Sequence, residues 1–130
     1  MILLGHRFIK GETLYHITNI DTISKTPPSS TIFMNFSEEN LDILKYAHQN
    51  SVAFSLKVQT ITELIYASNL GAKYIVLEKE LAKTAQEIAE AYLFDSKILV
   101  HIQDDEEIEE MALLNIDGVI YPNAIIKISS

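Results

Sequence analysis

The run from Ala72 to Tyr121 constrains the fold of this chain more than any other feature of its sequence. Short apolar segments, YIVL, KILVHI and GVIY, alternate there with two segments that begin with acidic residues and repeat apolar residues at helical spacing. This alternation is typical of consecutive βαβ units, in which the strands lie parallel in one sheet and the helices cover it. The sequence therefore predicts an α/β protein with a mainly parallel sheet.

The same alternation extends upstream to Thr31. A capping box formed by Thr60 and Glu63 predicts the start of one helix, which is expected to end at Gly71 in a left-handed conformation. In the segment SVAFSLKV, a two-residue period places apolar side chains on one face of a strand and small or polar ones, Lys57 among them, on the other. Strands are expected at 31–36, 51–58, 74–78, 97–103 and 118–121, and about four helices at 37–50, 60–71, 80–94 and 104–115.

Residues 1–30 are expected to add an N-terminal strand or hairpin, followed by an irregular loop that contains adjacent prolines. Two short strands are predicted at 2–9 and 13–17, and Gly11 can supply the positive φ of a tight turn between them. A second interpretation of the same residues is that only one strand joins the main sheet, while the other forms a flap or a dimer arm.

All 130 residues are predicted to form a single α/β domain, with repeated βα units over 31–121 and a C-terminal tail over 122–130. The expected five-stranded sheet is doubly wound if helices cover both faces and half-barrel-like if they cover one, and the pattern leaves both arrangements open. A sheet covered on one side would expose a large apolar face. A second subunit could cover that face, so self-association as a homodimer is expected.

Composition excludes several classes of function. The formal net charge is −8 and the ten Lys and Arg residues are scattered, so nucleic acid and anionic membranes are not expected as partners. The chain has no cysteine, which removes disulfides, thiolate zinc sites, iron–sulfur clusters and thiol catalysis. No segment approaches the roughly 18 uninterrupted apolar residues of a membrane span. We therefore expect a cytoplasmic protein.

The run from Lys97 to Tyr121, KILVHIQDDEEIEEMALLNIDGVIY, resembles the late βα units of (β/α)8-barrel enzymes. The resemblance is to the glycerophosphodiester phosphodiesterase family in particular, where a strand, an acidic helix and a GVDGI strand close the barrel. The chain as a whole also resembles small bacterial α/β proteins. The family's His-Arg-Gly motif has no counterpart, because Gly5, His6 and Arg7 stand in another order and no paired acidic ligands follow. Five strands are too few for such a barrel, so the resemblance does not extend to the family's activity.

Ligands of parallel α/β sheets bind beyond the carboxyl ends of the strands, and this rule selects the candidate site. Neighbouring strands would bring Lys57, Glu78 and His101 together at one edge of the sheet, where they are the candidate catalytic residues. A small molecule could bind there. The candidate substrate-binding residues are Asn35, Gln59, Gln103 and Tyr121.

Each catalytic candidate has a structural alternative. A lysine on the polar side of a buried strand can be activated as a Schiff-base nucleophile, but such a lysine more often extends to solvent or forms a structural ion pair, here with Glu78. His101 could act as a general base near neutral pH, but a histidine flanked by apolar residues is more often neutral, buried and hydrogen-bonded.

Cofactor and metal sites have little support. His6, His16 and His48 lack metal-ligand spacing, and the acidic run from Asp104 to Glu110 lacks the glycine of a calcium loop and falls at an expected helix start. No glycine lies in a loop that leaves a strand for a helix, so phosphate-loop binding is not expected. We therefore predict no cofactor and no metal.

Two functional hypotheses remain. The first is a homodimeric interaction or regulatory module without catalysis, which the sequence favours because the strand ends lack a recognisable catalytic motif. The alternative is a small lyase- or aldolase-like enzyme in which Lys57 forms a Schiff base with a small carbonyl compound.

Overall fold

The computed structural model describes residues 1–128 and contains one sheet of eight strands, every pair of which is parallel. The strands are β1 (Ile2–Leu4), β2 (Leu14–His16), β3 (Thr31–Asn35), β4 (Phe54–Lys57), β5 (Tyr74–Leu77), β6 (Lys97–His101), β7 (Gly118–Ile120) and β8 (Ile125–Lys127). The α-helices are α1 (Leu41–Gln49), α2 (Ile61–Leu70), α3 (Lys79–Ala91) and α4 (Glu106–Leu113), and the 3-10 helices are η1 (Ile20–Lys25), η2 (Glu38–Asn40) and η3 (Pro122–Ala124).

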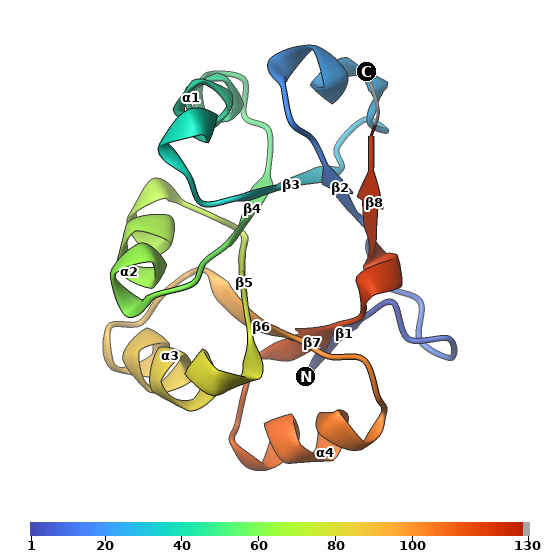
Figure 1. Cartoon of the computed structure of the whole chain (residues 1–130), viewed down its shortest axis with the longest axis vertical. Coiled ribbons are helices and arrows are strands. Elements are labelled where there is room, and N and C mark those ends of the chain that lie inside the picture. Colours follow the sequence, from blue (N-terminus) through green and yellow to red (C-terminus); the bar gives the residue numbers. More distant parts are fainter. Residues whose placement is uncertain (129–130) are drawn as a thin grey trace.

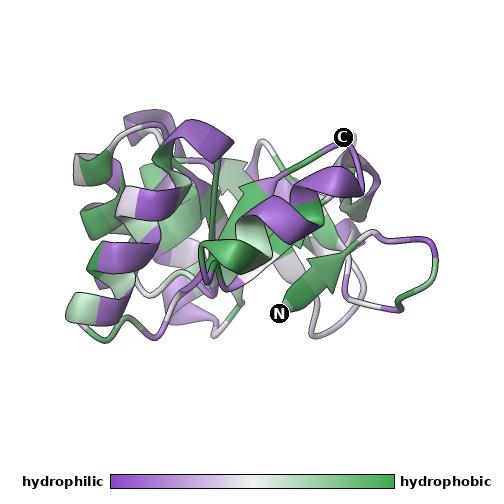
Figure 2. Ribbon diagram, turned by 90° about the horizontal axis from the view of Figure 1, so that it is seen from below, coloured by the Kyte–Doolittle hydropathy of each residue, from purple (hydrophilic) through white to green (hydrophobic). Residues whose placement is uncertain are grey.

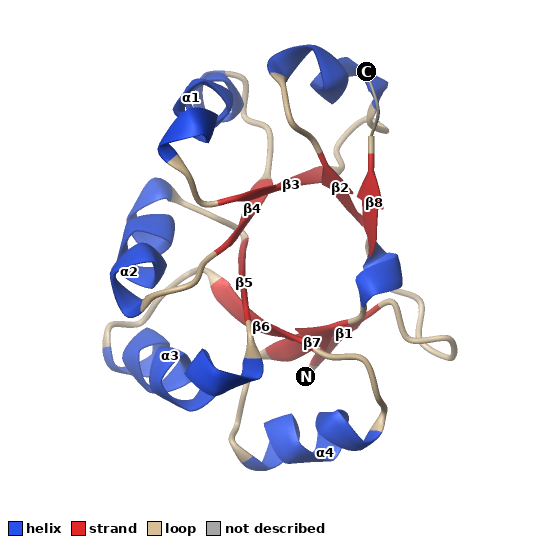
Figure 3. Ribbon diagram, viewed as in Figure 1, coloured by secondary structure: helices blue, strands red, loops and turns tan. Residues whose placement is uncertain are grey.

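The sheet is strongly curled, and its strands form a ring with the α-helices outside it (Figures 1 and 3). Its strand order is β1-β7-β6-β5-β4-β3-β2-β8, so β1 and β8 are the two edges. The segment that joins β7 to β8 links these edges. The Tyr121 amide donates a hydrogen bond to the Leu4 carbonyl at 2.9 Å, and the Asn123 side-chain amide donates one to the Gly5 carbonyl, also at 2.9 Å.

The predicted parallel α/β class is confirmed, but the prediction of five strands was wrong. The expected N-terminal hairpin does not form, because β1 pairs with β7 while β2 pairs with β3 and β8. The stretch after Tyr121 contains β8. β1 and β2 fall within the strands predicted at 2–9 and 13–17, whereas β8 lies in the segment predicted as a tail. Each has three residues, too few for a two-residue period to indicate which neighbours it pairs with. The curled, one-sided arrangement corresponds to the half-barrel alternative and excludes the doubly wound one.

Strand alternation divides the interior into two apolar layers. Residues such as Phe54, Leu56 and Ile98 face outward and pack beneath the helices. Ser55 lies between Phe54 and Leu56 and faces the inside of the ring, as the two-residue period predicted. In Figure 2 the strands are mainly in hydrophobic colours, whereas the helices carry many hydrophilic segments.

The curvature of the sheet buries its own inner face. Leu14, Phe33, Val76, Leu99 and Ile120 come from five strands and form one buried cluster inside the ring. Curvature therefore covers the face for which a second subunit was expected, and the sequence-based reason for a dimer does not apply to this fold. Self-association stays a prediction.

The helices begin at the edge where the strands end. The Thr60 side chain accepts a hydrogen bond from the Glu63 amide at 3.1 Å, which confirms Thr60 as the predicted N-cap. The Glu63 side chain accepts a hydrogen bond at 2.9 Å from the amide of Gln59, one residue before the cap, so the reciprocal bond of the predicted capping box is displaced by one residue. Gly71 ends the same helix with φ +89°, as expected. Within the part of the chain that the structure describes, no helix is long and apolar enough to cross a membrane.

Glu12 closes the opposite end of the ring, where the strands begin. It lies in the connection between β1 and β2, and its carboxylate accepts hydrogen bonds from the hydroxyls of Tyr74 and Thr31 and pairs with Lys73 at 2.9 Å. Burial alone would raise the pKa of Glu12, but these hydrogen bonds outweigh it and hold the pKa below its ordinary value. Burial of the Tyr74 hydroxyl and its hydrogen bond to the Glu12 carboxylate raise the pKa of Tyr74.

Candidate active site at the carboxyl ends of the strands

Polar side chains occupy the inner face of the ring where the strands end. The register of the strands places these residues, because paired residues of neighbouring parallel strands lie on the same face of the sheet. Asn35 pairs with Lys57, and His16 pairs with both Phe33 and Lys127. Phe33 belongs to the inner apolar cluster, so the residues in register with it also face inward. We call this group the mouth; its residues are His16, Asn35, Lys57, Glu78, His101 and Lys127.

Lys57, Glu78 and His101 converge at the mouth, as the sequence predicted. Glu78 Oε2 lies 4.0 Å from Lys57 Nζ and 3.3 Å from His101 Nδ1. The exposed side-chain fractions are 32% for Lys57, 53% for Glu78 and 23% for His101, so all three can be reached from solvent. The Glu78 carboxylate thus stands between an amine and an imidazole, an arrangement that can move protons between them.

The predicted substrate-binding residues are only partly brought together. Asn35 lies beside Lys57 in the neighbouring strand and is exposed. Gln59 and Gln103 are exposed and lie two residues beyond the ends of β4 and β6. Their backbone amides donate hydrogen bonds to Glu63 and Glu107, at the starts of α2 and α4. Asn35 is therefore the best placed of the three to contact a molecule at Lys57.

Tyr121 does not join the mouth. It is 9% exposed and packs in the outer apolar layer, and its hydroxyl donates a hydrogen bond to the Asp105 carboxylate. Burial and the Asp105 carboxylate raise the pKa of Tyr121 to about 12, while the Tyr121 hydroxyl and Arg7 hold the pKa of Asp105 below its usual value. Asp105 also lies 3.2 Å from Arg7 and 3.6 Å from His6, so this cluster ties the β1–β2 connection to α4.

Ser55 lies two residues before Lys57 on the same face of β4. Its side chain is fully buried, and its hydroxyl has no hydrogen-bond partner. An unpartnered buried hydroxyl costs about 1–3 kcal/mol. Proteins tolerate such costs most often at functional sites, and this one lies directly beneath the candidate nucleophile.

Replacing Ser55 with alanine is expected to raise the free energy of unfolding by about 1 kcal/mol, because the mutation removes a polar group that the fold leaves unsatisfied. Ser96 provides the matched control, since it is also buried but its hydroxyl donates a hydrogen bond to the Ala72 carbonyl. Ser96→Ala should therefore lower stability by about 1 kcal/mol. Urea denaturation of both variants measures the difference, and equal destabilisation would show that the Ser55 hydroxyl is satisfied in solution.

His16 and Lys127 were not among the residues selected from the sequence. Each ends a three-residue strand, and Lys127 lies in the segment that was interpreted as a tail. The alternation of Leu14, Tyr15 and His16 is the one signal that could have indicated an inward-facing histidine. Burial and the nearby Lys127 ammonium hold the pKa of His16 below its ordinary value.

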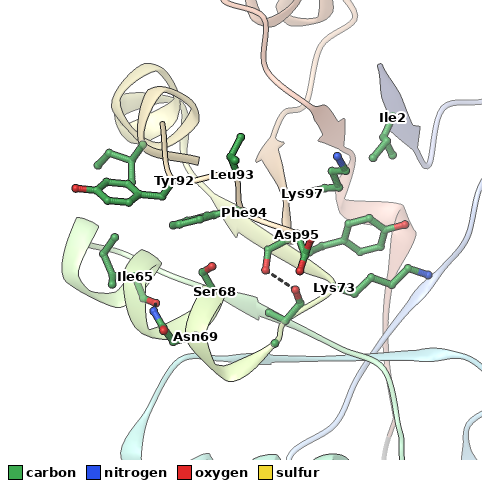
Figure 4. Close-up of a pocket in the computed structure, with 15 residues that line it drawn as sticks. Ile2, Ile65, Ser68, Asn69, Lys73, Tyr92, Leu93, Phe94, Asp95 and Lys97 are labelled. Carbon is green, nitrogen blue, oxygen red and sulfur yellow. Dashed lines mark hydrogen bonds between the residues drawn. The ribbon is translucent and has the colours of Figure 1, made fainter. Parts of the chain in front are cut away.

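A cavity of about 1180 Å³ opens at the other end of the strands and is separate from the mouth (Figure 4). Apolar side chains of α2 and α3, including Ile65 and Ile88, form part of its lining, and Lys73 and Lys97 lie at the starts of β5 and β6. Across residues 1–128, no group of three or more histidine, aspartate and glutamate side chains is arranged to hold a metal ion.

Comparison of the chain with models of known protein families and with curated protein sequences gives no match. The resemblance of the segment Lys97–Tyr121 to glycerophosphodiester phosphodiesterases stays a prediction. In the structure this segment forms β6, α4 and β7.

Proposed function

We propose that this protein is a small lyase- or aldolase-like enzyme that forms a Schiff base between Lys57 and a small carbonyl compound. The observation that carries the proposal is the position of the Glu78 carboxylate between Lys57 and His101, at the carboxyl ends of parallel strands. Lys57 supplies the nucleophile, Glu78 and His101 transfer protons, and Asn35 contacts the bound substrate.

The chemistry follows from the three side chains. The Lys57 ammonium gives a proton to Glu78, and the free amine then adds to the carbonyl carbon of the substrate. After the C–N bond forms, the nitrogen loses a second proton to the acid–base pair of Glu78 and His101. The former carbonyl oxygen takes up both protons and leaves as water, which produces an iminium ion on Lys57. That cation withdraws electrons from the adjacent carbon, so a C–H or C–C bond at that carbon can break. His101 can accept or return the proton of that C–H bond through Nε2, because the other ring nitrogen, Nδ1, is the one that contacts Glu78.

Two features of the fold favour this proposal over a non-catalytic dimeric module. The inner sheet face is buried within one chain, so its apolar residues do not call for a second subunit. The strand ends carry a connected acid–base set, Lys57, Glu78 and His101, although they lack a recognisable catalytic sequence motif. The Lys57–Glu78 contact is also what a purely structural ion pair would give, so the test must detect the covalent step itself.

Borohydride trapping tests the proposal. Incubation with pyruvate, dihydroxyacetone or acetone, followed by sodium borohydride, should reduce the iminium to a stable secondary amine on Lys57, which peptide mass spectrometry detects. Lys57→Met should abolish this modification. Glu78→Gln should slow it by roughly 100-fold, because the proton-transfer group is lost.

Lys83 provides the matched control, because it is an exposed lysine on α3. Lys83→Met should leave trapping unchanged. If exposed lysines such as Lys83 are modified as extensively as Lys57, or if no carbonyl compound is trapped on Lys57, the proposed function is wrong.

A further inference from the structure

Positive charge gathers at the mouth of a protein whose formal net charge is −8. Lys57 and Lys127 both extend from its inner face, and His16 and His101 add two groups that can be protonated. Glu78 is the one carboxylate in this group, and Lys57 and His101 already contact it. The half of the mouth formed by β2 and β8 therefore has basic side chains but no acidic one.

His16 and Lys127 are the two basic residues of that half. They pair in register on neighbouring strands, and the ring of His16 also contacts Phe33 edge-on at 5.2 Å between centroids. Among the side chains that the structure describes, no carboxylate forms an ion pair with either of them. His16 and Lys127 repel each other when both are charged, and they have no counter-ion among the described side chains. A bound anion would therefore stabilise this pair.

We propose that His16 and Lys127 bind a negatively charged group of the substrate, a carboxylate or a phosphate, while its carbonyl carbon reacts with Lys57. This inference rests on the proposed function and adds the substrate class, which is a small anionic carbonyl compound. Lys127 donates charge-assisted hydrogen bonds to the anion, and His16 donates a further one through its ring.

The spacing of the strands suits such a molecule. β2 is two strands away from β4, and His16 is in register with Ser55, two residues before Lys57. With about 4.8 Å between neighbouring strands and about 3.3 Å per residue along a strand, the backbone positions of His16 and Lys57 are roughly 12 Å apart. Both side chains extend over the same inner face, which shortens the gap between their polar atoms. A compound of a few carbon atoms can therefore reach Lys57 with its carbonyl group and the His16–Lys127 pair with its anionic group.

Anion binding can be measured without the covalent step, because acetate and inorganic phosphate lack a ketone or aldehyde that could form a Schiff base. Each ion is titrated into the full-length protein while the ring resonances of His16 are followed by NMR. We expect saturable shifts, and we expect Lys127→Gln to weaken the preferred ion about tenfold, the loss of one charge-assisted hydrogen bond. Lys127→Arg should retain binding, and Lys83→Gln should not change it. The ion that binds with the higher affinity, acetate or phosphate, indicates whether the substrate carries a carboxylate or a phosphate group.

The outcomes separate this inference from the proposed function. If neither ion binds, or if Lys127→Gln and Lys83→Gln weaken binding equally, the anion site is wrong, even where borohydride traps acetone on Lys57. If Lys127→Gln weakens binding selectively but no carbonyl compound is trapped, the anion site is correct and the Schiff-base function is wrong. Where both are correct, Lys127→Gln lowers the trapping of pyruvate by a larger factor than the trapping of acetone.

Discussion

Replacing Gly118 with alanine is expected to lower the free energy of unfolding by about 3 kcal/mol, the upper end of the usual cost of overpacking. Gly118 lies in β7 and pairs with Ile2 in β1 and Leu99 in β6. A methyl group at this position would lie 2.6 Å from the carbonyl oxygen and Cβ of Ile2. Backbone atoms cannot turn away as a flexible side chain can, so β1 must shift from β7.

Gly71→Ala is the matched control for this prediction. Gly71 adopts a positive φ, which an alanine tolerates poorly, but a methyl group there would have no neighbour within 4 Å. Gly71→Ala should lower the free energy of unfolding by only about 1 kcal/mol, the penalty for an alanine in the left-handed conformation. Urea denaturation of both variants gives the comparison. If Gly118→Ala costs no more than Gly71→Ala, the close pairing of β1 with β7 is wrong.

Replacing Glu12 with glutamine is expected to lower the free energy of unfolding at neutral pH by about 2 kcal/mol. The amide keeps the shape of the side chain, but it removes the negative charge that pairs with Lys73 and accepts from Tyr74. The expected value is modest because 30% of the Glu12 side chain is exposed, where water weakens ionic contacts. Glu87→Gln, at an exposed position on α3, should change stability little.

The contribution of Glu12 should also depend on pH. Burial opposes ionisation of Glu12, but the hydrogen bonds of Tyr74, Lys73 and Thr31 hold its pKa below the ordinary 4.5. A carboxyl with a depressed pKa stabilises the fold fully above its unfolded-state pKa, and the effect is lost as pH falls through the folded-state value. The difference in unfolding free energy between the wild type and Glu12→Gln should therefore shrink below about pH 4.5. A difference that stays constant in acid would contradict the Glu12 contacts.

Much of the candidate site could be predicted because it depends on local patterns. The period of SVAFSLKV places Lys57 opposite Phe54 and Leu56, and the βα alternation puts the ends of β4, β5 and β6 at one edge. Parallel neighbours then bring Lys57, Glu78 and His101 together without any knowledge of curvature. Tyr121 shows the limit of this reasoning, because it follows an inward-facing Ile120 and so turns to the outer layer.

The sequence by itself determined the parallel βα units, the capping of their helices and the convergence of three polar side chains, since each depends on residues close along the chain or in neighbouring units. Only the tertiary structure decided that the sheet curls, that β1, β2 and β8 join it, and that His16 and Lys127 complete the mouth. The sequence predicted strands that contain β1 and β2 but not their partners, and it missed β8, because three-residue strands carry too little periodicity to indicate which sheet edge they join. Contacts such as that between Glu12 and Tyr74, 62 positions apart, exist because curvature brings distant segments to one end of the ring.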